Sequence, residues 1–285
     1  MHSNTPTYSK IWNVTWPIML SLIAQNVVSV TDTAFLGHVG SIELGAAAIG
    51  GIFYITLFMV AYGFTTGVQI LIARRFGEKN YGLIGSIFDN SFYFLGISTL
   101  LISLFIVFLA PQLLKPLIQS TAVFNASIEF LNYRIFGLFF ASAILLFRSF
   151  YTGITFTKYI SLSAAIMAVA NVVLDYGLIF GKLGLPEMGI AGAGLASSVS
   201  EFLAFLYFVF ITLSKGSLKK YNLLRFSKPD FKIIGSIFNV SGYIVIQFVL
   251  SHGVWFALDD ARQTARVLLN PSKANERVLD FVSFT

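Results

Sequence analysis

Long apolar runs alternate with short polar connections along this chain, a pattern that predicts a bundle of membrane-spanning helices. A spanning helix needs about 20 mostly apolar residues. Seven runs meet that requirement, at residues 14–37, 44–71, 86–110, 129–150, 158–181, 189–214 and 233–257. Pro111 and Pro116 restrict helix formation after the third run, so residues 111–128 are expected to form an interfacial segment.

Composition supports a polytopic, all-α membrane protein. Of 285 residues, 56% are hydrophobic and only 11% are charged, whereas soluble domains carry about 25% charged residues. The chain contains no cysteine, which excludes disulfides, thiolate metal sites and cysteine nucleophiles. Its three histidines are scattered, so no resident metal or cofactor is expected.

The Lys and Arg residues of the connections predict an orientation, because cytoplasmic loops are enriched in them. With a cytoplasmic N-terminus, eleven lie on the inner side and two, Lys115 and Lys182, on the outer side. Topology therefore accounts for the net charge of +6, and no nucleic-acid partner is expected. Residues 215–232 are interpreted as a basic cytoplasmic linker, with contact to anionic membrane lipid as an alternative.

Two aspartates inside the apolar runs are the main functional clue, because a carboxylate in hydrocarbon is costly and usually functional. Asp32 and Asp175 lie about five and six residues before the outer ends of the first and fifth runs, at nearly equal depth. Asn171 shares a helix face with Asp175, and Gln25 shares one with Asp32. We expect these side chains to form a polar cluster.

The sixth run adds Ser197 and, one turn deeper, Glu201. Such a cluster is typical of an ion or substrate site in a transporter. Paired carboxylates can exchange a proton, and carboxylate, amide and hydroxyl oxygens can hold Na⁺. The structural alternatives are an Asp32 satisfied near the interface, an Asn171–Asp175 pair that joins helices, and a Ser197 that only permits close packing.

Three other charged residues have simpler interpretations. Asp89, near the inner end of the third run, is expected to pair with Arg74 or Arg75. Arg134 and Arg148, near opposite ends of the fourth run, are expected to extend toward the two membrane interfaces.

Enzyme motifs do not support a catalytic function. The sequence has no GxxxxGK[ST] phosphate loop, no HExxH and no GxSxG. The two aspartates leave an aspartyl intramembrane protease as an alternative, although its GxGD-type signature is missing. We therefore expect a transporter and not an enzyme.

Several stretches resemble the multidrug and toxic compound extrusion (MATE) family, in particular its bacterial DinF-like branch. The resemblance covers residues 8–256 and rests on these segments: WPIMLSLIAQNVVSVTDTAFLGHVGSIELGAAAI, ARRFGEKN, YRIFGLFF with LLFRSFYTGITFTKY, and NVVLDYGLIFGKLGLPEMGIAGAGLASSVSE. It implies two six-helix lobes in a bacterial inner membrane, and export of hydrophobic or cationic drugs or toxic metabolites in exchange for H⁺ or Na⁺.

The resemblance also implies roles for the polar residues. The family's cation site maps onto Asp32, Asn171, Asp175 and Ser197, and its substrate cavity includes Gln25; we add Glu201 to that cavity. A flippase of lipid-linked precursors is the neighbouring transporter class. Such proteins usually line the cavity with basic residues, so an inward-facing Arg134 or Arg148 would favour it.

The resemblance divides the chain into four parts. Residues 1–214 correspond to a six-helix N-terminal lobe, residues 215–232 to the linker, and residues 233–257 to a seventh helix that begins a C-terminal lobe. Residues 258–285 form a charged tail unlike the family pattern. The chain is thus expected to be truncated after its seventh helix, and a missing C-terminal lobe is an expected partner.

Overall fold

A computed structural model describes residues 8–226 and 228–269 and confirms the predicted all-helical membrane fold. In this part of the chain, seven helices are long and apolar enough to cross a membrane. Their bounds, with one short 3₁₀ helix, are α1 Tyr8–Val39, α2 Ser41–Gly77, α3 Tyr81–Leu114, α4 Thr121–Gly153, α5 Lys158–Phe180, α6 Gly189–Ser214, η1 Gly216–Tyr221 and α7 Phe231–Leu269.

The stretch between α3 and α4 differs from the prediction. Residues 111–128 are not a separate interfacial segment, because α3 continues through Pro111 to Leu114 and α4 begins at Thr121. Pro111 lies in the last turn of α3, so the backbone hydrogen bond that it removes weakens only the end of the helix. Pro116 follows the helix end. Ser120 caps α4 by accepting a hydrogen bond from the Val123 N–H (3.4 Å). These local signals lengthen both helices.

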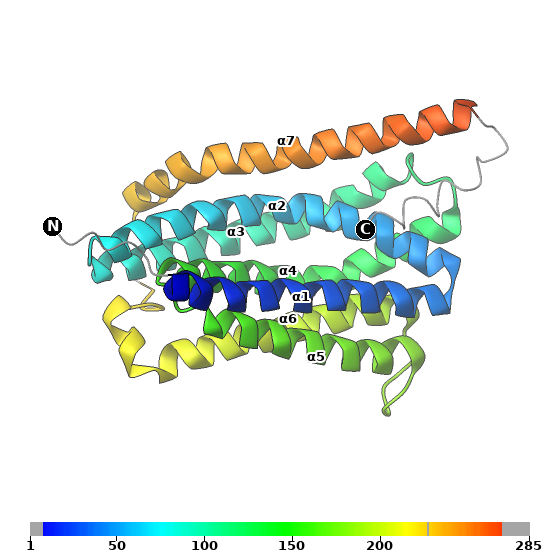
Figure 1. The fold of residues 1–285 in the computed structure, drawn as a ribbon. Helices are drawn as coiled ribbons and strands as arrows, with labels where there is room; N and C mark the ends of the chain where they lie inside the picture. The colour runs from blue at the N-terminus through cyan, green and yellow to red at the C-terminus, as the bar shows by residue number, and fades with distance from the viewer. Residues whose placement is uncertain (1–7, 227, 270–285) are drawn as a thin grey trace.

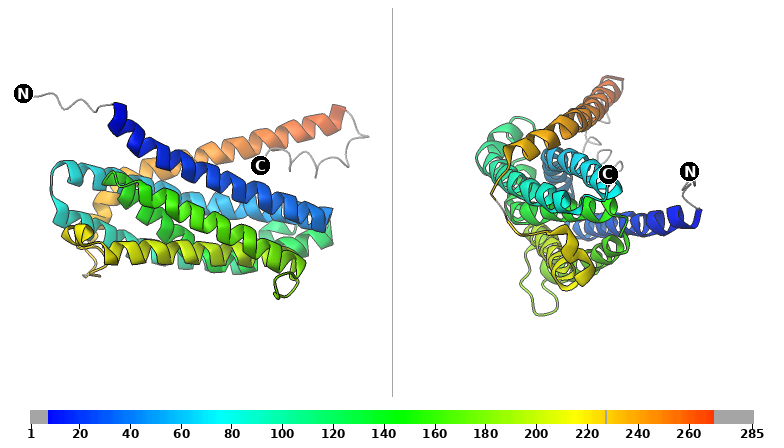
Figure 2. Two further views of the ribbon diagram at one scale, coloured as in Figure 1. Left: turned by 60° about the horizontal axis from the view of Figure 1, so that its bottom comes forward. Right: turned by 90° about the vertical axis from the view of Figure 1, so that its left-hand side faces the viewer.

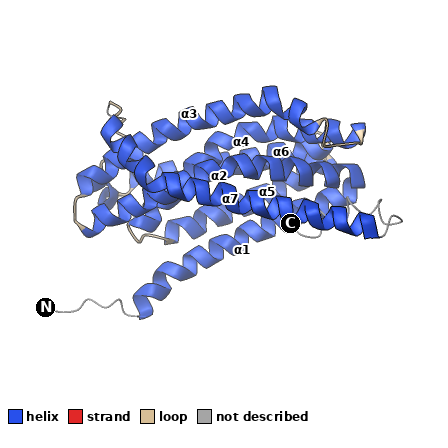
Figure 3. Cartoon of the chain, turned by 90° about the horizontal axis from the view of Figure 1, so that it is seen from above, coloured by secondary structure: helices blue, strands red, loops and turns tan. Residues whose placement is uncertain are grey.

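The helices run roughly along a common axis, with α4 at the centre of the bundle (Figure 1). α4 packs against α2 and α6, α5 packs against α6 and α1, and α7 lies against α2. Figures 2 and 3 show that the N-terminal half of α1 diverges from the other helices. That half contains Pro17, which lies inside the helix and removes one backbone hydrogen bond. The hydrophobic core is built mainly by α2 to α6, and Leu36 of α1 and Ile237 of α7 are buried in it.

Glycines on α6 permit the close helix approach that the sequence AGAGLASSVS predicts. A β-carbon at Gly192 would collide with the backbone of Leu178 on α5. A β-carbon at Gly194 would press against the Phe130 carbonyl on α4. Small residues at such crossings let two membrane helices pack backbone to backbone. α6 is thereby held against α4 and α5, two of the helices that carry the polar side chains described below.

The seventh helix extends beyond the predicted span. α7 continues from the predicted end at residue 257 to Leu269, so the first part of the charged tail belongs to a helix. Residues 270–285 lie outside the described part of the chain.

Candidate functional site: a buried cluster of carboxylates

Asp32, Asn171 and Asp175 meet between α1 and α5, which agrees with their equal predicted depth. With its amide oriented to match the surrounding acceptors, the Asn171 Nδ2 donates to Asp32 Oδ1 (3.0 Å) and to Asp175 Oδ2 (3.2 Å). Asn171 and Asp175 are buried, and Asp32 is half-buried. One amide therefore links carboxylates from two helices that are distant in sequence.

The two carboxyl groups also lie within hydrogen-bond reach of each other. A hydrogen bond between two carboxyl groups needs a proton on one of them. The second oxygen of Asp175, Oδ1, is buried and has no hydrogen-bond partner in the part of the chain that the structure describes. An unsatisfied buried oxygen is costly, typically by about 1–3 kcal/mol. The pair is thus placed to share a proton, and one oxygen of Asp175 remains available as an acceptor.

A second pair of charges lies close to this trio. The Arg134 guanidinium on α4 donates to both carboxylate oxygens of Glu201 on α6, Nη1 to Oε2 at 2.7 Å and Nη2 to Oε1 at 2.6 Å. The Arg134 and Glu201 side chains are only 15% and 10% exposed. Arg134 also lies over the ring of Tyr54 on α2, 4.4 Å from its centre. Arg134 therefore joins α2, α4 and α6 and does not extend to the interface as predicted.

Gly137 makes room for this ion pair. A β-carbon at position 137 would collide with the Glu201 carboxylate, the Arg134 guanidinium and the Ser198 hydroxyl. The ion pair is close enough to act on the trio: Arg134 attracts the Asp32 carboxylate and Glu201 repels it. Three carboxyl groups thus face one guanidinium, a formal charge of −2 if all three were ionised. Such an excess of negative charge in a low-dielectric interior favours binding of cations.

The other predicted site residues lie on the same helices but contact different groups. Among the described residues, no hydrogen bond joins the Ser197 hydroxyl to either aspartate; its backbone carbonyl accepts from Ser200 (2.9 Å). Its neighbour Ser198 is buried and donates to the Tyr133 carbonyl on α4 (2.9 Å). Gln25 is half-buried, two turns before Asp32.

Asp89 has different partners from those predicted. Arg74 and Arg75 pair with Glu78, at 3.0 and 2.6 Å. Hydrogen bonds from Arg75 and then Arg74 hold the pKa of the Glu78 carboxyl below its ordinary value. Asp89, on α3, accepts the backbone N–H groups of Leu224 and Phe226 instead, at 2.8 and 2.9 Å. Its role is to hold the segment that follows η1.

This geometry defines a polytopic helical membrane protein with an internal ionisable site formed by α1, α4, α5 and α6. The sequence assigns it more narrowly. The family model MatE matches residues 17–177, and the chain belongs to that family.

Among its relatives, the chain is 25% identical to the probable multidrug resistance protein NorM of Brucella suis over 85% of this chain and 52% of that protein. It is 29% identical to the probable multidrug resistance protein NorM of Listeria innocua over 81% of this chain and 53% of that protein. The chain thus spans about half the length of these curated relatives.

Solved structures share the fold. The eukaryotic MATE transporter AtDTX14 superposes with a TM-score of 0.78 at 20% identity, over 86% of this chain and 53% of that one. An outward-facing MATE family transporter of the MOP superfamily gives a TM-score of 0.80 at 18% identity, over 89% of this chain and 56% of that one.

Proposed function

We propose that the chain supplies the cation-binding lobe of an antiporter that exports hydrophobic or cationic drugs or metabolites in exchange for H⁺ or Na⁺. The observation that carries the proposal is the Asn171 amide, which joins Asp32 to Asp175 while Asp175 Oδ1 has no partner. The names of the relatives, probable multidrug resistance proteins, support a drug as cargo. An excess of acidic groups supports cargo of positive charge.

In this proposal, the coupling ion enters the space between α1 and α5. A proton on the aspartate pair lowers the formal negative charge of the cluster by one. A Na⁺ would do the same, held by Asp32, Asp175 Oδ1, the Ser197 hydroxyl and, once the amide turns, the Asn171 oxygen. The lower negative charge weakens the attraction for a cationic drug and favours its release. Contact between the two carboxyl groups supports the proton, whereas the free Asp175 oxygen supports Na⁺. Gln25 and Glu201 are proposed to line the path of the cargo.

The test is ion binding by the purified chain, because binding needs only the residues described above. Calorimetric Na⁺ titration, and proton release on addition of a cationic dye, are measured for the wild type, Asp32→Asn and Asp175→Asn. Asp230→Asn is the matched control, since Asp230 is exposed on the loop before α7. We expect a loss of more than tenfold in ion affinity or proton release for the first two variants and none for the control. Unchanged binding in both site variants would refute the proposal.

The meeting of two aspartates also suits the alternative of an intramembrane protease, so their proximity alone does not separate the two functions. Asn171 argues against the protease, because its amide is bonded to both carboxyl groups and occupies the place between them that a catalytic water needs. The relatives are named as resistance proteins and not as peptidases. Cleavage of a transmembrane peptide that disappears in Asp175→Asn would support the protease instead.

One observation favours the flippase alternative. Arg148 on α4 is half-buried near Tyr62, and within the described residues it forms no ion pair. A free guanidinium attracts anionic cargo such as a lipid-linked phosphate. Arg148→Gln would then weaken binding of a fluorescent lipid phosphate several-fold and leave a cationic dye unaffected. The opposite selectivity, with dye binding lost in Asp32→Asn, would support the antiporter.

A further inference from the structure

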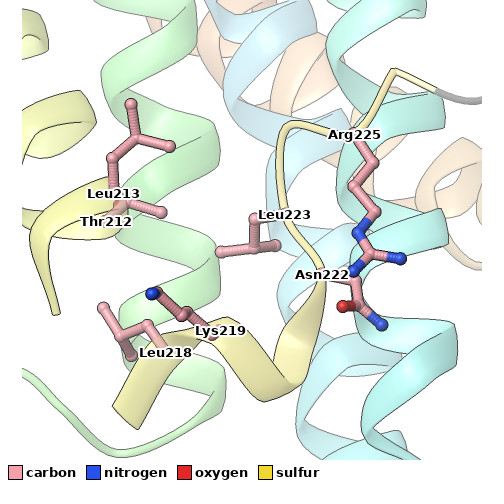
Figure 4. Close-up of a pocket in the computed structure, with 7 residues that line it drawn as sticks. All are labelled: Thr212, Leu213, Leu218, Lys219, Asn222, Leu223 and Arg225. Atoms are coloured by element: carbon pink, nitrogen blue, oxygen red, sulfur yellow. The ribbon is translucent and has the colours of Figure 1, made fainter. Parts of the chain in front are cut away.

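A pocket opens at the end of the bundle opposite the carboxylate cluster, where α6 ends and η1 begins (Figure 4). Its volume is about 240 Å³, smaller than the roughly 300–1,000 Å³ of sites for drug-sized ligands. Lys219 rises from η1 on one side, and Arg225 and Asn222 lie on the other. The pocket therefore suits a small anionic group and not a drug.

The charge of the pocket has one sign. Lys219, Arg225 and the Asn222 amide are its polar groups together with Thr212, and none of the described residues that line it is acidic. The Thr212 hydroxyl is already hydrogen-bonded to Tyr151 (2.8 Å). The two cations and the amide thus remain as donors, a set that matches phosphate oxygens.

Asp89 fixes the position of Arg225. Its two carboxylate oxygens hold the N–H groups of the residues on either side, Leu224 and Phe226. Both of these residues have left-handed backbone angles, φ 57° and 48°, which few side chains adopt without support. Because the backbone is tied to α3 on both sides, Arg225 is presented from a fixed turn.

Exposed apolar side chains adjoin the pocket. Leu213 lines the pocket and is 58% exposed, and Phe210, one turn earlier on α6, is 67% exposed. On a membrane-spanning helix these side chains face acyl chains. A ligand at this place would have its anionic group in the pocket and its hydrocarbon against α6, which is the form of an anionic phospholipid.

We propose that this pocket binds the phosphate group of an anionic phospholipid, with Lys219 and Arg225 as its charged ligands. The basic linker would then hold one specific lipid at the inner membrane surface in addition to any diffuse attraction. The inference stands independently of the antiporter proposal, because it uses none of the residues of the carboxylate cluster.

The test is retention of phosphatidylglycerol by the purified full chain, measured by native mass spectrometry during titration in neutral detergent. A direct charge-assisted hydrogen bond to phosphate contributes about tenfold or more in affinity, in addition to the diffuse attraction that every cation of the linker adds. We therefore expect Lys219→Gln/Arg225→Gln to bind phosphatidylglycerol about 100-fold more weakly. Lys215→Gln/Lys228→Gln is the matched control, since it removes two charges from the same linker outside the pocket lining. It should lose only the diffuse attraction, a clearly smaller change, and phosphatidylcholine should bind weakly to every variant.

A second arm separates the lipid from a soluble anion. Glycerol 3-phosphate and inorganic phosphate are added as competitors at millimolar concentration. We expect neither to displace the lipid, because neither has acyl chains to contact Leu213 and Phe210. Displacement by either would overturn the assignment to a lipid in favour of a soluble phosphate ligand. Equal loss of lipid in the two double variants would overturn the pocket altogether.

Discussion

Asp89 and Asp175 are both aspartates buried inside apolar helices, 2% and 0% exposed, but their oxygens have different partners. Both oxygens of Asp89 accept backbone N–H groups of the segment after η1. Asp175 shares the Asn171 amide with Asp32, and its other oxygen has no partner among the described residues. A satisfied carboxylate stabilises a fold, whereas an incompletely satisfied one is costly unless it binds something. The comparison separates a structural aspartate from a candidate ligand.

The largest expected effect comes from the ion pair beside Asp175. Arg134→Met leaves the Glu201 carboxylate buried without a partner, so we expect a loss of about 3–5 kcal/mol in the free energy of unfolding. The double variant Arg134→Met/Glu201→Leu removes both charges and should recover most of this stability. Thermal or denaturant unfolding in mild detergent measures both. A double variant as unstable as the single one would mean that the ion pair does not stabilise the site through its charges.

The next effect tests Asp89 as a structural anchor. Asp89→Ala leaves two backbone N–H groups without their charged acceptor, and we expect a loss of about 2–4 kcal/mol. The segment at Leu224 to Phe226 should also become susceptible to limited proteolysis. Asp230→Ala removes only the hydrogen bond that the Asp230 carboxylate accepts from the Lys232 N–H at the start of α7, so it serves as the control and should cost about 1 kcal/mol. Resistance of the Asp89→Ala loop to protease would contradict the anchor.

Replacement of aspartate by asparagine should change the stability of the protein in opposite directions at Asp175 and Asp89. Asp175→Asn removes a buried carboxylate with an unsatisfied oxygen, so we expect stability to rise by about 1 kcal/mol while cation binding is lost. Asp89→Asn should lower stability, because one of its two acceptors becomes an NH₂ group facing an N–H. Unfolding midpoints of the two variants, compared in one detergent, decide the matter. If Asp175→Asn destabilises as much as Asp89→Asn, both aspartates are structural.

The smallest effect concerns Ser197. No hydrogen bond links its hydroxyl to the aspartates in the described part of the chain, so Ser197→Ala should change stability by less than about 0.5 kcal/mol. We expect the cation affinity of Ser197→Ala to fall less than that of Asn171→Ala, because the second variant loses the amide that bridges Asp32 and Asp175. Calorimetric titration of the two variants gives the ranking. A larger effect for Ser197→Ala than for Asn171→Ala would make the serine hydroxyl the more important of the two ion ligands.

The sequence predicted that Asp32, Asn171 and Asp175 lie together, because this depends only on the direction of each helix and the depth of each residue in the membrane. Asp32 and Asp175 needed only the order of the spans, and the four-residue spacing from Asn171 to Asp175 needed only helical periodicity. The seven helices followed from apolar length in the same way.

The ion pair was missed because of one helix boundary. A predicted start at residue 129 places Arg134 near the membrane interface. α4 actually begins at Thr121, so Arg134 is 13 residues inside it, and Glu201 is 12 residues inside α6. The signal was present in Ser120, a residue type that caps helices. Asp89 was assigned to nearby arginines because its true partners are backbone groups of residues more than 130 positions away, which side-chain chemistry does not reveal.

The segment between η1 and α7 has a mechanical consequence. Asn90, next to Asp89 on α3, accepts the backbone N–H of Asp230 (2.7 Å), and α7 starts at the following residue, Phe231. This hydrogen bond ties the beginning of α7 directly to α3, so no flexible hinge separates them. A rotation of the six-helix body should therefore move the first turn of α7 with it. Spin labels on α3 and at the start of α7 should keep one narrow distance distribution while other interhelical distances broaden.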